Sequence, residues 1–162
     1  QALVRYLHSF GPTPPPPAAD WSTLTGDADR GEALFLANCS RCHTAEGDGG
    51  TTGPDLTNIT DLRSRQDLVL AIRDPGETIL NTYHSATVVT GEGQLRGVIV
   101  MEDDSSIRLR MMDGRERNFA KSDLLDLVHD QESLMPAFST NRLRDGELND
   151  VLVYLRTVAA RN

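Results

Sequence analysis

The chain has 162 residues, with 16 Lys and Arg against 24 Asp and Glu, which gives a formal net charge of −8 at pH 7. A chain of this size has room for one well-buried core, or for a small domain that carries an insertion, and two full-sized domains are not expected. The acidic balance argues against nucleic acid as a partner, because a phosphate-binding surface needs a basic excess. No run of residues has the apolar length needed to cross a bilayer, so no transmembrane segment is expected in this chain.

The first 26 residues are expected to precede the folded core. Residues 1–10 are typical of the end of a helix, and a proline-rich run over residues 11–17 breaks it and predicts a stiff polyproline II spacer. Two interpretations of this region stay open, a frayed terminus and a linker from a preceding domain. Because Gln1 is not an initiator methionine, we expect the chain to be processed or excised from a longer one.

The core, residues 27–162, is expected to begin with a helix. Residues 29–32 (Asp-Arg-Gly-Glu) have the spacing of a capping box, and Ala33, Leu34 and Phe35 supply an apolar stripe. This helix runs directly into the stretch Cys39-Ser40-Arg41-Cys42-His43.

Two cysteines three positions apart, with a histidine directly after the second, are the attachment pattern of a c-type haem. On one helical turn Cys39 and Cys42 can reach both vinyl groups of a porphyrin to form thioethers, and the His43 imidazole then points at the iron as its proximal ligand. These are the only cysteines in the chain, so a disulfide framework elsewhere is excluded. The motif therefore predicts one covalent haem c as the cofactor. Because such attachment takes place outside the cytoplasm in bacteria, the motif also predicts a periplasmic or otherwise extracytoplasmic location.

Two other interpretations of the same residues stay open. A thioredoxin-like dithiol needs a strand that leads directly into the motif, and it does not need His43. A zinc site needs a fourth ligand from another histidine, and the candidates are His8, His84 and His129.

After the motif, the glycine-rich residues 47–54 predict a loop without regular structure. A second helix is indicated by Ser64-Arg65-Gln66-Asp67, which is followed by the apolar residues Leu68, Val69, Leu70 and Ile72. This helix is expected to stop before Asp74-Pro75-Gly76, because the residue before a proline disfavours the helical conformation.

The pattern then changes from helical to alternating. Between Ser106 and Met111 apolar and polar residues alternate, which is the period of a half-buried strand. We predict about four short antiparallel strands over residues 84–120, with Asp113-Gly114 as a two-residue hairpin turn. Residues 122–128 are predicted to return as a short helix.

The last element is predicted to be a helix that packs on the first one. Its apolar stripe is formed by Leu148, Val151, Leu152, Leu155 and Val158, at helical spacing. The predicted fold is therefore mainly α, a helical core around the haem, with residues 84–120 inserted as a small antiparallel sheet.

The sixth position of the iron decides between electron transfer and small-molecule chemistry, and Met135 is the best candidate to fill it. Pro136 keeps its segment extended, so that a loop can hold the thioether in one direction. The other methionines, at 101, 111 and 112, lie on predicted strands and are interpreted as core residues. His84 and His129 are the rival ligands, while His8 lies outside the predicted haem domain.

A methionine ligand favours ferrous iron and leaves no vacant site for oxygen or peroxide. His43 and Met135 as metal ligands therefore predict a one-electron carrier, with no catalytic residue and no bond-making chemistry of its own. The alternative is a haem enzyme or gas-binding sensor, in which Met135 is loosely bound and the distal side opens.

At this point the chain resembles class I cytochrome c. Gly31 and Phe35 match the glycine and aromatic residue that let the family's first helix cross its last one, where Val151 and Tyr154 match their partners. Residues 53–56 (Gly-Pro-Asp-Leu) resemble the family's loop after the attachment site. This resemblance implies that Pro54 and Leu56 contribute to the cofactor site, and that the Pro54 carbonyl accepts a hydrogen bond from His43.

More narrowly, residues 29–156 resemble the putative haem-binding domain of the Pirellula/Verrucomicrobium type, a cytochrome c variant with an inserted sheet. The likeness rests on residues 53–56, Arg73-Asp74-Pro75, Tyr83, residues 86–90, 97–100, Ser133-Leu134-Met135-Pro136 and 152–155. It implies that Met135 is the distal ligand, and that the partner is a redox protein or a fused β-propeller dehydrogenase-like module. One departure is Arg144, which stands where a serine or threonine cap is usual and is expected to weaken the last helix by about 1 kcal/mol.

The role of the inserted sheet is not encoded in any motif. Two roles are considered, a lid that covers the haem edge and a docking surface for a partner domain, and we favour the lid.

Overall fold

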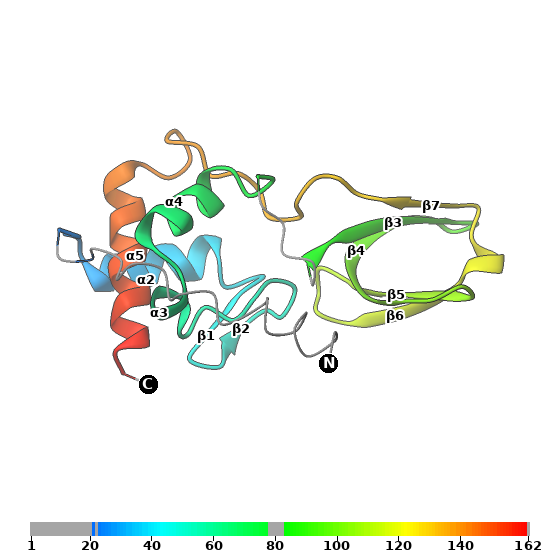
Figure 1. Ribbon diagram of the computed structural model, residues 1–162, viewed down its shortest axis with the longest axis horizontal. Coiled ribbons are helices and arrows are strands. Elements are labelled where there is room, and N and C mark those ends of the chain that lie inside the picture. Colours follow the sequence, from blue (N-terminus) through cyan, green and yellow to red (C-terminus); the bar gives the residue numbers. More distant parts are fainter. Residues whose placement is uncertain (1–20, 22, 78–82, 162) are drawn as a thin grey trace, which may run out of the picture.

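The computed structural model describes residues 21, 23–77 and 83–161. The predicted helix end and proline-rich spacer lie outside these residues. In Figure 1 the helices gather on one side of the molecule and the long strands on the other. We call these parts the helical lobe and the sheet lobe. Within the described part of the chain, no helix is both long enough and apolar enough to cross a membrane.

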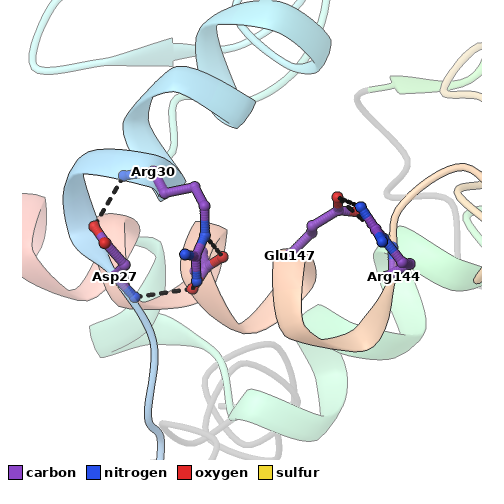
Figure 2. Close-up of polar contacts among 5 residues, drawn as sticks. Asp27, Arg30, Arg144 and Glu147 are labelled. Carbon is purple, nitrogen blue, oxygen red and sulfur yellow. Dashed lines mark hydrogen bonds and ion pairs between the residues drawn. The ribbon is translucent and has the colours of Figure 1, made fainter.

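The first described helix, α2 (Ala28–Asn38), starts two residues earlier than its predicted capping box. The cap is Asp27, whose carboxylate accepts the Arg30 N–H at 3.0 Å, so the box expected from residue 29 is not the one used (Figure 2). The Asp27 backbone N–H in turn donates to the carboxylate of Asp150, at 2.8 Å. Asp27 rather than Asp29 therefore caps the helix, because Asp27 has the extended backbone conformation that an N-cap requires.

Helix α5 (Asp145–Ala159) crosses α2, as the apolar stripe predicted. All five stripe residues are buried, and the Phe35 and Tyr154 rings lie 5.4 Å apart between centroids. A Cβ on Gly31 would overlap the Asp150 carbonyl and lie 2.9 Å from Tyr154 Cβ. The close crossing of the two helices therefore depends on glycine at this position.

The N-terminus of α5 makes more hydrogen bonds than we expected from an arginine at the N-cap position. The Glu147 carboxylate accepts the Arg144 backbone N–H at 2.8 Å, and the Arg144 guanidinium donates to the same carboxylate (Figure 2). Glu147 thus supplies the return half of a capping box, which offsets part of the loss expected from the missing serine or threonine.

Two shorter helices complete the helical lobe, α3 (Ile59–Leu62) and α4 (Arg65–Arg73). The helix predicted after Ser64 is confirmed, and it starts with a capping box: the Asp67 N–H donates to the Ser64 hydroxyl at 3.1 Å, and the Ser64 N–H donates to the Asp67 carboxylate at 3.2 Å. The helix ends before Asp74, as predicted.

The glycine-rich segment is more regular than expected. Strands β1 (Thr44–Ala45) and β2 (Asp48–Gly49) pair antiparallel around Glu46 and Gly47. Both turn residues have positive φ, 54° and 86°, which is the backbone of a tight primed turn. The prediction of a loop without regular structure was wrong here, because a two-residue ladder is too short to leave a periodic pattern.

The sheet lobe consists of β3 (Ser85–Thr90), β4 (Gly93–Glu102), β5 (Ser106–Arg110), β6 (Glu116–Ala120) and β7 (Asp126–His129). Their order is β6-β5-β4-β3-β7, and every neighbouring pair is antiparallel. The alternating residues of β5 behave as predicted, since Ile107 and Leu109 are fully buried.

Two predictions for this lobe were wrong. The segment predicted as a short helix contains only a 3₁₀ turn (Lys121–Asp123) and then strand β7, so the sheet reaches beyond residue 120 to His129. The hairpin before β6 also encloses three residues, not two, because the Met111 N–H donates to the Arg115 carbonyl at 2.8 Å. Asp113-Gly114 does lie in this turn, with Gly114 at φ 79°.

The sheet encloses a core of its own. Ala86, Val88, Ile107 and Leu109 form it, and no residue of this cluster belongs to the buried clusters of the helical lobe. The fold therefore combines helices with a sizeable antiparallel sheet, and the prediction of a mainly α protein is only partly correct.

Candidate haem site

The cysteine motif lies just past the end of α2. Cys39 caps the helix, and its N–H donates to the Phe35 carbonyl at 2.8 Å. The Cys42 and His43 amides both donate to the Cys39 carbonyl, each at 3.0 Å. The motif was expected on a helical turn, and it occupies hydrogen-bonded turns that continue from the helix. Both cysteines and the histidine line one cavity.

The His43 imidazole is buried and oriented by the loop that follows it. Its Nδ1 lies 2.9 Å from the Pro54 carbonyl oxygen, and since a carbonyl only accepts, Nδ1 carries the proton. A Cβ on Gly53 would lie 2.5 Å from the ring carbon Cε1 of His43, so only glycine lets the loop pass this close. This tautomer leaves the Nε2 lone pair available as a metal ligand.

Burial sets the protonation state of the site. It lowers the pKa of His43, although the hydrogen bond to Pro54 opposes this effect, so the imidazole is held neutral. Burial, with a smaller contribution from Cys42, raises the pKa of Cys39 to about 11, and burial also raises the pKa of Cys42. A zinc site stabilises thiolates, and this apolar setting disfavours them.

Among the residues that the structure describes, the zinc interpretation finds no fourth ligand. His84 and His129 are both exposed and neither lines the cavity, while His8 lies outside the described residues. His129 instead lies 2.7 Å from the Glu102 carboxylate, through Nε2. In the described ranges, no group of three or more His, Cys, Asp or Glu side chains has the spacing of a metal site. The dithiol interpretation also fails its own condition, since helix α2 leads into the motif.

The cavity has a volume of about 300 Å³ and lies between the motif, α4 and the loop that carries Met135. Pro54, Leu56 and Met135 all contribute to its lining, as do Phe35 and Leu68. Met135 is partly buried and packs against the helical-lobe cluster of Phe138 and Leu152. All six residues expected at the cofactor thus line a single cavity.

The sheet lobe also reaches this cavity, which the sequence did not predict. Val98 and Met112 line it, and Tyr83 lies at the same wall. Met112 was interpreted as a core residue of a strand, but it lies in the turn between β5 and β6. Next to it, the Thr52 hydroxyl donates to the Met111 carbonyl at 3.3 Å, which joins the hairpin to the loop that orients His43. Long-range pairing of this kind leaves no local sequence signal.

The donor set fits a covalent haem better than a bare ion. One neutral imidazole and one thioether face the same mostly apolar space, and two thiols stand beside the imidazole. Imidazole and thioether are ligands that haem iron takes in electron-transfer proteins. Among the described residues, no three His, Cys, Asp or Glu side chains lie close enough together to hold a metal ion, so the oxygen cluster that a hard cation takes is not formed here by carboxylates.

Comparison with known proteins supports this interpretation for the first part of the core. Residues 28–95 match the family model described as Cytochrome c. A 46-residue stretch is 46% identical to the protein "Cytochrome c-553-like" of Synechocystis sp., covering 28% of this chain and 43% of that relative. The chain thus spans less than half the length of the curated relative it matches. The match of residues 28–95 indicates a cytochrome c family domain over this part of the chain, and such a domain implies a covalently attached haem c. The matched range ends in β4, before Met135.

Proposed function

Because the match of residues 28–95 indicates a cytochrome c family domain, we propose that the protein is a one-electron carrier with a single haem c ligated by His43 and Met135. One observation supports it above the others. Cys39, Cys42 and His43 share one cavity with Met135, although 92 positions separate the histidine from the methionine. When bound, the haem supplies the one-electron couple of its iron.

Each residue of the proposed site has a distinct task. The Cys39 and Cys42 sulfurs hold the porphyrin by thioether bonds, which also fix its position relative to His43. Pro54 keeps the imidazole in one orientation and one tautomer. Met135 supplies a soft sulfur, which favours the ferrous state and raises the reduction potential relative to a second imidazole. The apolar lining, including Leu56, excludes water, so little solvent has to reorganise on electron transfer.

The proposal extends to the context of the domain. Covalent haem attachment fits an extracytoplasmic location, such as the periplasm. The electron partner is either a separate redox protein or a dehydrogenase module fused to this chain. We further propose that the sheet lobe is a lid inserted in the cytochrome domain, because Val98 and Met112 form one wall of the cavity.

The test is an absorption spectrum of oxidised and reduced protein, wild type beside Met135→Ala. If Met135 is the ligand, the variant loses the far-red methionine–iron band, becomes partly high-spin and shifts to lower potential. Met101→Ala is the matched control, because Met101 is an exposed methionine outside the cavity. An unchanged spectrum of Met135→Ala refutes the proposed ligand.

A second measurement separates the carrier from a haem enzyme or gas sensor. Carbon monoxide is titrated into the reduced wild-type protein. A carrier with Met135 bound to the iron reacts slowly and incompletely. Rapid binding at stoichiometric carbon monoxide would establish an open distal site and refute the carrier.

A further inference from the structure

The segment that carries Met135 bridges the two lobes. We call residues 131–138 the distal loop. It leaves the sheet at the end of β7 and ends at Phe138, whose N–H donates to the Ile72 carbonyl of α4 at 3.0 Å. Figure 1 shows this stretch running from β7 across to the helices. The position of Met135 therefore depends on how both ends of the loop are held.

The sheet end is held by a polar network around Asp130. Its backbone N–H donates to the Ser85 carbonyl at 2.9 Å. Its carboxylate accepts hydrogen bonds from the Ser85 hydroxyl at 2.8 Å, the Thr87 hydroxyl at 3.1 Å and Arg96 Nε at 2.7 Å. The Asp130 side chain is only 12% exposed. A carboxylate this shielded is expensive to detach from its donors.

Arg96 extends this network into the distal loop itself. While its Nε binds Asp130, its Nη2 donates to the Glu132 carbonyl at 3.1 Å. One guanidinium from β4 thus fixes a side chain at the start of the loop and a backbone group three residues before Met135. A lysine could make only one of these two contacts in the same geometry.

The other end is held by a second arginine. Arg73 of α4 donates through Nη1 to the Phe138 and Leu143 carbonyls, both at 2.6 Å. Its Nη2 pairs with Asp145 at 2.7 Å. Between these two anchors the Met135 N–H donates to the Ser133 hydroxyl at 3.1 Å.

We propose that Arg96 and Asp130 are positioning residues for the distal ligand, and that the sheet lobe serves as the mount that keeps the Met135 thioether at the haem iron. This inference rests on the proposed function, in which Met135 is that ligand. It assigns a role to the sheet that a lid alone does not have. Loosening the mount raises the fraction of molecules in which the iron's sixth position is open.

The geometry allows this role to be tested without unfolding the sheet. Ser85, Thr87 and Arg96 lie outside the apolar cluster of the sheet lobe, which is built from residues such as Val88 and Leu109. Removing the Arg96 side chain therefore leaves the sheet core intact.

The experiment compares Arg96→Ala with Arg117→Ala, in the full chain carrying haem. Arg117 is an exposed arginine of β6 that stacks on Phe119, and β6 lies at the opposite edge of the sheet from β7, which leads into the distal loop. Imidazole is titrated into the ferric proteins as a competitor of Met135. Its affinity is expected to rise about tenfold in Arg96→Ala, because apparent affinity scales with the open fraction. Arg117→Ala should match wild type, and Arg96→Lys should lie between.

Amide hydrogen exchange gives a second readout that does not depend on the ligand. Peptides covering residues 131–138 are expected to exchange faster in Arg96→Ala, while peptides of β5 keep wild-type protection. If neither the imidazole affinity nor this exchange changes, the mount is refuted. Faster exchange without a change in affinity also refutes it, because the loop would then be free without opening the iron.

Failure of this inference can be distinguished from failure of the proposed function. If Met135→Ala keeps the wild-type spectrum, Met135 is not the ligand and the proposed function and the mount fall together. If Met135→Ala loses the methionine band while Arg96→Ala behaves like wild type, only the mount falls.

Discussion

The two lobes of this molecule are built from different kinds of contact. In the helical lobe, α2 and α5 cross at Gly31, and the residues that form the crossing recur at helical spacing along each of the two helices. In the sheet lobe, an apolar core is enclosed by strands β3 to β6, which pair with their neighbours in sequence, and by β7, which pairs with β3 from far along the chain. The cavity lies where the lobes meet, and both supply residues to it. Stability and ligand geometry are therefore expected to separate: the helical lobe holds the chain together, and the sheet lobe controls the distal side.

The largest effects are expected from opening a cavity in the core of each lobe, which tests whether the two lobes respond separately. Leu152 and Leu109 are both fully buried, one in each lobe. Each leucine-to-alanine change is expected to lower the unfolding free energy of its own lobe by about 2 to 5 kcal/mol. Hydrogen exchange locates the effect. Leu109→Ala should deprotect the strands and leave α2 and α5 protected, and equal deprotection of both lobes would show a single cooperative unit.

A bulkier side chain at the helix crossing tests the helical lobe alone. Gly31→Leu is expected to cost about 3 kcal/mol, because the new side chain forces α2 away from the Asp150 backbone. The measurement is urea unfolding followed by circular dichroism. Gly146→Ala is the matched control: a Cβ there meets no atom within 4 Å, and alanine should stabilise α5 by about 0.5 to 1 kcal/mol. A Gly31→Leu protein as stable as wild type would refute the crossing.

Acid should weaken the helical lobe through Asp150. This carboxylate is 1% exposed, and the Arg30 guanidinium, which donates to it at 2.8 Å, lowers its pKa despite burial. Because the folded pKa lies below the usual 3.8, the stabilisation is complete above pH 3.8 and is lost as pH falls through the folded value. Asp150→Asn should cost about 2 kcal/mol at pH 7 and flatten this acid dependence in urea unfolding. An unchanged acid slope would assign the dependence to other carboxylates.

The smallest expected effect concerns the start of α4. Ser64→Ala removes the hydroxyl that accepts the Asp67 N–H and should cost about 1 kcal/mol. Ser64→Asp keeps an acceptor and should retain most of the stability. Thermal unfolding measures both variants, and equal melting temperatures for alanine and wild type would show that this cap is replaced by water.

Sequence patterns predicted the helical lobe well because its information is local. The stripe from Leu148 to Val158 and the helix start at Ser64 need only neighbours within two turns. The existence of the sheet was predicted but not its extent, since β7 has only four residues and its two apolar ones, Leu127 and Val128, are adjacent and so point to opposite faces. Its pairing with β3 closes a long stretch of chain, which no window along the sequence reports.

The same distinction applies at the candidate site. The motif from Cys39 to His43 is visible in the sequence because chemistry fixes its spacing. Met112 could not be assigned to the cavity, since only the turn between β5 and β6 brings it there. The anchor formed by Arg96 and Asp130 was equally hidden, because 34 positions separate the two residues.

The pairing of β3 with β7 has a topological consequence for the whole chain. Ala86 lies opposite His129, and the Asp130 N–H bonds to the Ser85 carbonyl. The chain thus leaves the helical lobe for the sheet and returns from it through two adjacent, hydrogen-bonded strands, as it would through the base of a hairpin. For the helical lobe, the residues between Ala86 and His129 therefore act as a single long loop. The entropy cost of closing this loop rises only slightly as the loop becomes longer. Changes in length at the far end of the sheet can therefore accumulate without displacing His43 and Met135.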